Sequence, residues 1–385
     1  MNTMGKTKNF VSVVMPCLNE EKTVALCVQQ AKKSLAKTGL SGEVVVCDNG
    51  SIDKSVILAQ KAGARVIVER QRGYGSAYLA GIKAAKGDTI VIGDSDGTYN
   101  FLEVPKLLVK LKKGADLVLG SRLKGNAKKG AMPLLNRFLG TPTLNFFLRL
   151  FYGIKISDSQ SGMRAFSKKT FQKLKLRTLG MEFASEMLVR AVGEGLTIAE
   201  VPISYSKRVT PTKLSRFRDA WRHLRFMLLF APTYLFLIPG AVFLFAGSIL
   251  MISLSLGPVS FFGRYLDFHS MILGSMLSLL GYQIIMLGIY AKAFSWTQGI
   301  DTQSRLISTT LGFFRLEKGI VLGILVSLVG LAVGLSTYID WAKSGFGPLS
   351  AVRPAIFSMT LFVLGMQIIF SSFFLSILGI EKKAS

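Results

Sequence analysis

Four long apolar stretches constrain the fold of this chain more than any other feature of its sequence. They cover residues 228–256, 271–291, 320–339 and 356–377. Each is long enough to cross about 30 Å of hydrocarbon as a helix, and a helix satisfies its own backbone hydrogen bonds inside a bilayer. We therefore predict an all-α transmembrane domain of four helices over residues 228–385.

Most charged side chains lie before these stretches, and they are mainly basic. The chain has 47 Lys and Arg residues against 22 Asp and Glu residues, which gives a net charge of +25. Such a surplus suits nucleic acid, an anionic membrane surface or phosphorylated substrates. Because the sequence has no nucleic-acid-binding motif and no basic-aromatic repeat, we predict membrane and phosphate partners and no nucleic acid.

Basic residues flank the apolar stretches unevenly. They gather before the first stretch, between the second and third, and after the fourth, and the last two groups include Lys292, Arg305, Arg315, Lys318, Lys382 and Lys383. Cytoplasmic segments next to membrane spans carry an excess of Lys and Arg. We therefore predict that the N-terminal domain and the C-terminus both lie in the cytoplasm.

The first 120 residues alternate short β-branched runs with helical patterns. The runs that we predict as strands cover residues 10–15, 43–47, 64–69, 88–93 and 116–120. Strands that alternate with helices in this way form a doubly wound α/β domain with a Rossmann-like, mostly parallel sheet. Ser51 is the residue we expect to cap the second helix.

Polar side chains follow three of the predicted strands. Asn19 and Glu20 follow the first strand, Asp48 the second, and Asp94 and Asp96 the fourth. The carboxyl ends of parallel strands meet at one edge of a sheet, about 5 to 10 Å apart, and ligands bind there. Two carboxylates can hold a hard divalent cation, which can hold a diphosphate, while Asp48 can accept hydrogen bonds from a nucleobase or ribose.

The motifs PCLNEE, DNGSID, RGYGSA, GDSDGT and SQSGMRAF occur in this order along the chain. With this order and spacing, residues 10–225 resemble a family 2 glycosyltransferase with the A-type nucleotide-sugar-binding fold. The nearest resemblance within that family is to the polyprenyl-phosphate (dolichyl-phosphate) mannose or glucose synthases. It implies a mixed, mostly parallel sheet in a glycosyltransferase domain over residues 1–209, and a divalent cation, Mg²⁺ or Mn²⁺, as cofactor.

The same resemblance implies a donor site. Asp94 and Asp96 match the catalytic metal motif, and Thr98 stands where some dolichyl-phosphate mannose synthases have a glutamine ligand. For Glu182 two roles remain open: it contacts the sugar, or it caps the start of a helix. The residues expected to bind the nucleotide sugar are Pro16, Asn19, Glu20, Asp48, Gly50, Ser51, Arg72, Gly73 and Ser95. In this set, Gly73 would let the backbone approach the ligand closely, and Arg72 would supply positive charge.

An acceptor side is expected after the fifth strand. Residues 133–152 are apolar and aromatic, with Arg137 and Arg149 among them, and form either an amphipathic helix at the membrane interface or a core helix. Arginine suits a phosphate because its fork donates two hydrogen bonds. The resemblance implies an acceptor-phosphate site made of Arg122, Arg137, Thr141, Ser161 and Arg164.

Residues 210–227 lead into the first apolar stretch as a basic, amphipathic pattern. Apolar residues that include Trp221 recur at helical spacing, and the basic residues are Lys213, Arg216, Arg218, Arg222 and Arg225. We predict a juxtamembrane helix that lies on anionic lipid.

The expected function is the inverting, metal-dependent transfer of mannose or glucose from a GDP- or UDP-linked sugar to polyprenyl phosphate at the cytoplasmic membrane face. One alternative is a processive polysaccharide synthase, although its Gln-x-x-Arg-Trp motif is replaced by WRHLR at residues 221–225. Two further alternatives are a non-catalytic sugar-nucleotide sensor and a component of a lipid-sugar flippase. Spans without polar lining residues fit a flippase poorly. Assembly of a homo-oligomer through the spans is left open.

Overall fold

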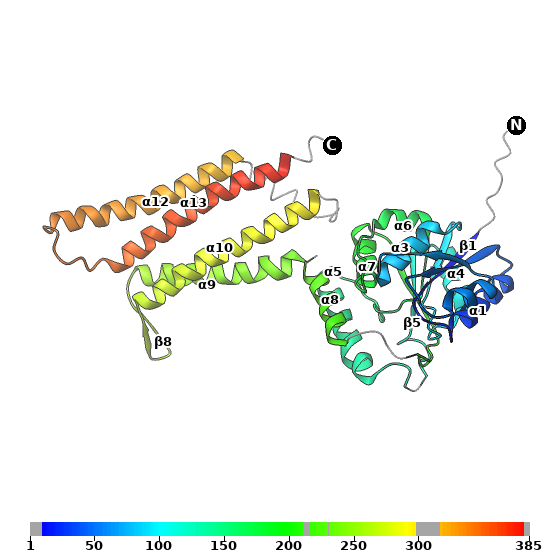
Figure 1. The fold of residues 1–385 in the computed structure, drawn as a ribbon. Coiled ribbons are helices and arrows are strands. Elements are labelled where there is room, and N and C mark those ends of the chain that lie inside the picture. The colour runs from blue at the N-terminus through cyan, green and yellow to red at the C-terminus, as the bar shows by residue number, and fades with distance from the viewer. Residues whose placement is uncertain (1–9, 129, 211–215, 230, 298–315, 381–385) are drawn as a thin grey trace. The chain divides into compact units, whose positions relative to one another are not determined.

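The computed structural model describes residues 10–128, 130–210, 216–229, 231–297 and 316–380. The chain divides into two compact units, Met1–Met227 and Leu228–Ser385, and each is described here by itself (Figure 1). Several predicted features lie wholly or partly outside the described residues: Lys213 in the 210–227 helix, and Arg305, Arg315, Lys382 and Lys383 near the spans.

The first unit is built on a seven-stranded sheet with the order β3-β2-β1-β4-β6-β5-β7. All neighbouring strands are parallel except that β6 runs antiparallel to β4 and to β5. The strands are β1 (Val11–Cys17), β2 (Gly42–Asp48), β3 (Arg65–Val68), β4 (Thr89–Ile92), β5 (Leu117–Ser121), β6 (Arg164–Ser167) and β7 (Ile198–Pro202). The prediction of a mixed, mostly parallel α/β sheet is therefore confirmed.

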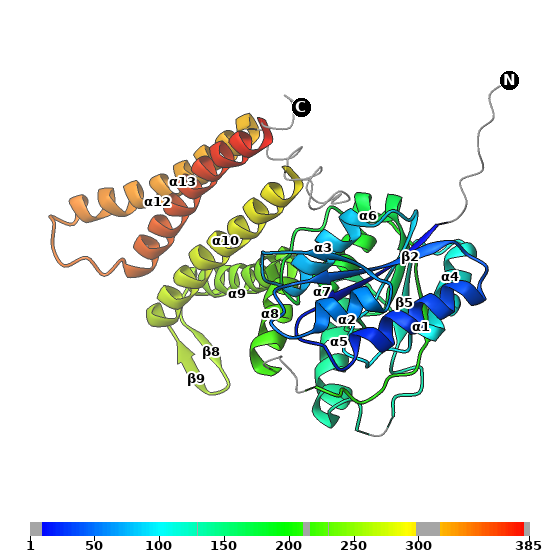
Figure 2. The same ribbon diagram turned by 45° about the vertical axis from the view of Figure 1, so that its right-hand side comes forward.

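Helices cover both faces of this sheet (Figure 2). Because alternate residues of a strand point to opposite faces, Val13 of β1 packs with α1 and α4, and Val14 packs with α3 and α7. The helices of this unit are α1 (Val24–Lys37), α2 (Ser55–Lys61), α3 (Tyr74–Ala84), α4 (Val104–Lys112), α5 (Thr141–Tyr152), α6 (Lys168–Leu174), α7 (Phe183–Gly193) and α8 (Arg216–Leu229). Two short segments, η1 (Phe101–Glu103) and η2 (Asn136–Gly140), precede α4 and α5.

The order of the strands reverses between β1 and β4, since β2 and β3 continue on one side and β6, β5 and β7 on the other. Ligands of open α/β sheets bind beyond the carboxyl ends of strands at such a switch point. Two hydrogen bonds tie the two strand ends together here: Ser95 Oγ donates to the Pro16 carbonyl at 2.6 Å, and Thr23 Oγ1 donates to the Ser95 carbonyl at 2.8 Å. The polar residues after β1 and β4 are thereby held side by side.

Within its described residues, the second unit contains four helices that are long and apolar enough to cross a membrane: residues 233–255, 268–294, 316–343 and 352–378. The prediction of four spans is confirmed. The elements are η3 (Thr233–Leu237), α9 (Ile238–Ser255), the hairpin β8 (Val259–Phe261) and β9 (Arg264–Leu266), α10 (Phe268–Thr297), α12 (Leu316–Lys343) and α13 (Val352–Ile380).

Glycines set how closely α9 and α10 approach. A Cβ atom added at Gly247 of α9 would overlap the backbone of Gly274 and Ser278 of α10. Small residues allow this kind of close packing, which holds membrane helices together where no hydrophobic driving force between them exists.

Gly247→Leu should therefore force α9 and α10 apart and destabilise the second unit by about 1–3 kcal/mol. Thermal unfolding of the full chain in detergent, followed by helical circular dichroism, would measure this. The control is Ile249→Leu on the same helix, whose side chain is 64% exposed and should leave the transition unchanged. Equal transitions for both variants would contradict the role given to Gly247.

Candidate active site

Two acidic side chains stand at the end of β4. Asp94 Oδ1 accepts hydrogen bonds from the hydroxyl groups of Tyr74, at 2.9 Å, and Tyr78, at 2.8 Å. Burial and the neighbouring charge of Asp96 raise the pKa of Asp94 to about 6, against the opposing effect of the two tyrosines. Like charges at a site with little access to water repel each other, so a cation is favoured beside the half-buried Asp94 and the buried Asp96.

Asp96 is oriented by its own turn and by a distant arginine. Its Oδ1 accepts from the Thr98 backbone N–H at 3.0 Å and from the Thr98 hydroxyl at 2.6 Å. Its Oδ2 lies 3.5 Å from Arg208 Nε, and Arg208 Nη2 donates to Glu20 Oε1 at 2.7 Å. Arg208 thus joins the polar residues after β1 and β4.

Sequence reasoning did not identify Arg208. It follows β7, at the far edge of the sheet from β1, and several basic residues surround it in the sequence. No local pattern marks which of these residues returns to the switch point.

Hydrogen bonds link the loop after β1 to the loop after β2. Asn19 N–H donates to Ser51 Oγ at 2.9 Å, and Ile52 N–H donates to Asn19 Oδ1 at 2.8 Å. The predicted helix cap at Ser51 is therefore wrong, because α2 begins at Ser55 and the Ser51 hydroxyl is used between loops. Asp48 accepts from the N–H groups of its own turn, Gly50 at 3.1 Å and Ser51 at 3.2 Å, which orients its carboxylate.

Asn49, which the sequence analysis did not single out, fixes the loop after β3. Its side chain donates to the Glu69 and Gln71 carbonyls and accepts from the Gly73 N–H at 2.8 Å. The Arg72 guanidinium lies next to Gly50, within 4 Å of the position of an added Cβ atom.

The sequence predicts glycine at position 73 because of close approach to a ligand. In the structure, glycine is needed there because another segment of the chain approaches closely. With φ at 154°, Gly73 packs against the Leu179 carbonyl, and Gly75 packs against the backbone of residues 178–180; a Cβ on either would overlap these atoms. The two glycines therefore leave room for the backbone of residues 178–180 beside Tyr74.

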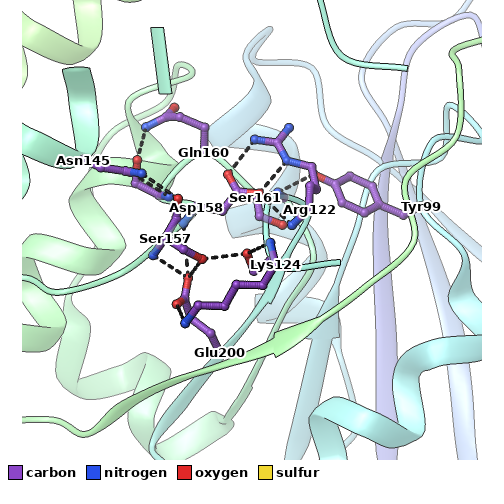
Figure 3. A network of polar contacts seen from close by, with 12 residues as sticks. Tyr99, Arg122, Lys124, Asn145, Ser157, Asp158, Gln160, Ser161 and Glu200 are labelled. Atoms are coloured by element: carbon purple, nitrogen blue, oxygen red, sulfur yellow. Dashed lines mark hydrogen bonds and ion pairs between the residues drawn. The ribbon is translucent and has the colours of Figure 1, made fainter. Parts of the chain in front are cut away.

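A polar network joins the end of β5 to the pre-β6 loop, residues 157–163 (Figure 3). Arg122 donates to the Asp158 carboxylate from Nε at 2.8 Å and from Nη2 at 2.7 Å. Glu200 of β7 accepts from the N–H groups of Ser157 and Asp158, and from Lys124 Nζ at 2.6 Å. The carboxylate of Asp158 therefore fixes Arg122, and the carboxylate of Glu200 fixes the pre-β6 loop.

The pre-β6 loop reaches the acidic pair. A Cβ added at Gly162 would lie 2.8 Å from Asp94 Oδ2 and 3.0 Å from the Tyr74 hydroxyl, and the Gly162 N–H donates to the Tyr99 hydroxyl at 2.6 Å. The preceding residue, Ser161, is fully buried, and its Oγ has no hydrogen-bond partner among the described residues. A buried hydroxyl without a partner costs free energy, which a hydrogen bond to a bound ligand would offset.

Arg164, an expected phosphate contact, lies beneath this loop and is 1% exposed. Its Nε, Nη1 and Nη2 donate to the carbonyls of Ser161, Ala184 and Ser159 at 2.7–3.0 Å. Because its guanidinium is used to fix the loop to α7, we omit Arg164 from the proposed phosphate site.

Arg137 and Thr141 lie on the segment that leads into α5. Arg137 is exposed, whereas Thr141 is buried at the first residue of α5. One turn later, Asn145 donates to the Ser157 carbonyl at 2.6 Å and accepts from the Ser159 N–H at 3.1 Å. The helix that carries Thr141 is therefore attached to the pre-β6 loop.

Large apolar side chains around η2 and α5 face outward. Leu148 is buried, but six neighbours are 43–73% exposed: Leu134, Leu135, Phe138, Leu139, Phe146 and Leu150. An exposed apolar patch of this kind marks a contact surface. This exposure favours the membrane-interface alternative for residues 133–152 over a core helix.

Glu182 makes no side-chain capping bond at the start of α7. Its Oε2 is buried and has no hydrogen-bond partner in the part of the chain that the structure describes. The cap alternative is therefore excluded, and a contact with the sugar remains a prediction.

The acidic pair fits a divalent cation. Asp94 and Asp96 supply the carboxylate oxygens that Mg²⁺ and Mn²⁺ prefer, and water and a diphosphate commonly complete such a shell. Across the described ranges, no group of three or more His, Cys, Asp or Glu side chains could hold a metal. The protein itself thus offers two carboxylates, and the Thr98 hydroxyl is already engaged by one of them.

Comparison with known proteins shows the family of this chain. The family model Glycosyl transferase family 2 matches residues 12–175, and the Glycosyltransferase family 2 C-terminal transmembrane region matches residues 289–379. Low-salt glycan biosynthesis hexosyltransferase Agl6 of Haloferax volcanii is 40% identical over 373 residues, covering 96% of this chain and 89% of that protein. The chain belongs to glycosyltransferase family 2. The prediction of a membrane-spanning glycosyltransferase is therefore confirmed, and the non-catalytic sensor alternative is excluded.

Two further proteins are similar to this glycosyltransferase. The dolichyl-phosphate hexose transferase of Haloferax volcanii is 34% identical over 211 residues, which cover 55% of this chain and 89% of that protein. Glucosyl-3-phosphoglycerate synthase from Mycobacterium tuberculosis, solved with Mn²⁺, UDP and glucosyl-3-phosphoglycerate, is 27% identical with a TM-score of 0.46; the match covers 58% of this chain and 80% of that chain.

Thr98→Val in the glycosyltransferase should weaken Mn²⁺ binding about tenfold, because Asp96 loses the hydroxyl that orients it but keeps the backbone bond. Electron paramagnetic resonance of Mn²⁺ with GDP or UDP present would measure this. Thr98→Ser should restore affinity, and Thr38→Val, at the end of α1, should not change it. Unchanged Mn²⁺ binding in Thr98→Val would contradict the orienting role.

Proposed function

We propose that this glycosyltransferase transfers a hexose, mannose or glucose, from a GDP- or UDP-linked donor to the phosphate of a polyprenyl phosphate. The observation that carries the proposal is the contact of Gly162 with Asp94, which joins the Arg122 network to the acidic pair. The names of the two Haloferax volcanii relatives, a hexosyltransferase and a dolichyl-phosphate hexose transferase, support the same substrate classes.

On the donor side, Asp48 would accept hydrogen bonds from the nucleoside, beside Pro16, Asn19, Gly50 and Ser51. Asp94 and Asp96 would hold Mg²⁺ or Mn²⁺, which neutralises the charge of the diphosphate leaving group. Arg208, which is paired with Glu20 and Asp96, supplies a second positive charge at the same place.

On the acceptor side, Arg122 and Ser161 would bind the lipid phosphate. A phosphate whose last pKa is near 6 is already anionic at pH 7, so it needs positioning more than a general base. Its oxygen would attack the anomeric carbon from the side opposite the diphosphate, and the configuration would invert. Arg122 can donate to the phosphate, and the unpartnered Ser161 hydroxyl can add a further hydrogen bond.

The lipid would reach this site from the bilayer surface. The exposed apolar residues of η2 and α5 would enter the interface, with Arg137 and Arg149 toward lipid phosphates and Thr141 at the base of the segment. The basic helix that includes α8 would lie on the same surface. The distribution of basic residues supports a cytoplasmic position for the first unit and for the C-terminus.

Purified protein in liposomes with polyprenyl phosphate should convert one radiolabelled nucleotide hexose into a chloroform-soluble product that mild acid hydrolyses. Asp96→Asn should lower this transfer by at least about 100-fold, because the diphosphate loses its counter-charge. The matched control is Asp116→Asn, which removes a charge at the opposite end of the sheet, before β5. Full transfer by Asp96→Asn, or no lipid product from any GDP- or UDP-hexose, would contradict the proposal.

Ser161→Ala should raise the KM for polyprenyl phosphate about tenfold and leave the KM for the nucleotide sugar unchanged. The reason is the loss of one hydrogen bond to a charged phosphate, worth about 1.5–3 kcal/mol. Ser34 offers a matched control, since its Oγ is also buried without a partner among the described residues but lies on α1, away from the proposed phosphate site. If Ser34→Ala and Ser161→Ala have the same acceptor KM, Ser161 does not contact the acceptor.

A further inference from the structure

A groove of about 690 Å³ lies between α10 and α13 of the second unit. Its walls are apolar and aromatic with a polar centre, formed by Tyr282, Gln283, Met286, Leu287 and Tyr290 of α10 and Phe362, Val363, Met366, Gln367, Phe370 and Ser371 of α13. This corrects the expectation that the spans have no polar lining residues.

The two helices run in the same direction along this groove, as Figures 1 and 2 both show. Contacts follow one another along both: the Asp267–Arg353 ion pair, then a hydrogen bond between Ser275 and Thr360 at 2.7 Å, then the rings of Tyr290 and Phe374 at 4.7 Å. The groove lies between the last two contacts, so it is bounded at both ends and open at its side.

The polar centre of the groove lies at mid-membrane depth. The two candidate spans are residues 268–294 and 352–378, so Gln283 and Gln367 each lie two positions after the midpoint. Gln283 is exposed, and Gln367 Oε1 is buried without a hydrogen-bond partner among the described residues. Lipid tails cannot supply the missing hydrogen bonds, and polar groups left unpaired in hydrocarbon are unfavourable.

The geometry points to a second copy of this chain as the occupant of the groove face. A carboxamide both donates and accepts, so the exposed Gln283, beside the half-buried Gln367, complements the same groove face of another copy related by a twofold axis. Leu287, Phe362 and Phe370 are 54%, 43% and 65% exposed at the rim and would pack across the interface. A phosphorylated lipid headgroup is a poorer occupant, because none of the described residues that line the groove is basic.

The interface therefore pairs α10 and α13 of two copies, with carboxamide hydrogen bonds between the copies at the bilayer centre. Such bonds are a recognised source of membrane-helix association. This proposal concerns the second unit and does not rest on the proposed acceptor or donor sites.

Single-molecule photobleaching of labelled full-length protein in dilute liposomes tests the proposal. The wild type should bleach mainly in two steps. The double variant Gln283→Leu and Gln367→Leu should shift the dimer dissociation constant upward at least about tenfold. Leucine is favourable in hydrocarbon, so this variant should insert normally, as monodisperse behaviour in detergent would check. Ser336→Leu on α12, which removes an exposed polar group away from the groove, should leave the dimer intact.

Disulfide formation in membranes adds a test that leaves both glutamines in place. Leu287→Cys, at the rim, should cross-link to itself, and Leu325→Cys, exposed on α12, should not. Single-step bleaching of the wild type, an unchanged dimer in the double variant, cross-linking only at position 325, or native mass spectrometry that finds one bound polyprenyl lipid in a monomer would each overturn the proposal.

Discussion

The candidate site of the first unit is arranged around two carboxylates at the end of β4, the half-buried Asp94 and the buried Asp96. Burial and the charge of Asp96 raise the pKa of Asp94 to about 6, so the pair needs compensation from its surroundings. Two tyrosine hydroxyls and the Thr98 hydroxyl donate to it, and Arg208 approaches from β7. A cation and a diphosphate would complete this compensation, which supports the proposed donor site at this strand end.

In the proposed function, the same pair also determines where an acceptor would bind. Gly162 has no side chain, so the pre-β6 loop can lie against Asp94, and this loop carries the unpartnered Ser161 hydroxyl. Asp158 of the loop accepts from Arg122, just after β5, and Glu200 of β7 accepts from the Ser157 N–H. Arg164 donates to the Ala184 carbonyl of α7, so three elements hold the loop. In the proposed function, a phosphate bound beside this loop would attack a donor bound at the acidic pair with inversion.

Local patterns in the sequence were enough to predict the first five strands, the polar strand ends and the four spans, because hydrophobic period, helix length and turn residues are properties of short segments. Arg208 and Asn49 could not be predicted in this way, since their partners lie far away in the sequence. The reason for glycine at position 73 and the buried position of Arg164 also depend on tertiary contacts, with Leu179 and Ala184. The polar groove went unnoticed because Gln283 and Gln367 lie 84 residues apart in strongly apolar helices.

The most direct test of the account is calorimetric titration of the full-length protein with GDP and with UDP, each in Mn²⁺ and in EDTA. The acidic pair predicts that one nucleotide binds in Mn²⁺ with at least about tenfold higher affinity than in EDTA, and that Asp94→Asn removes this difference. Equal affinity in Mn²⁺ and EDTA, or a cation dependence that survives in Asp94→Asn, would contradict the claim that the end of β4 is the nucleotide–metal site.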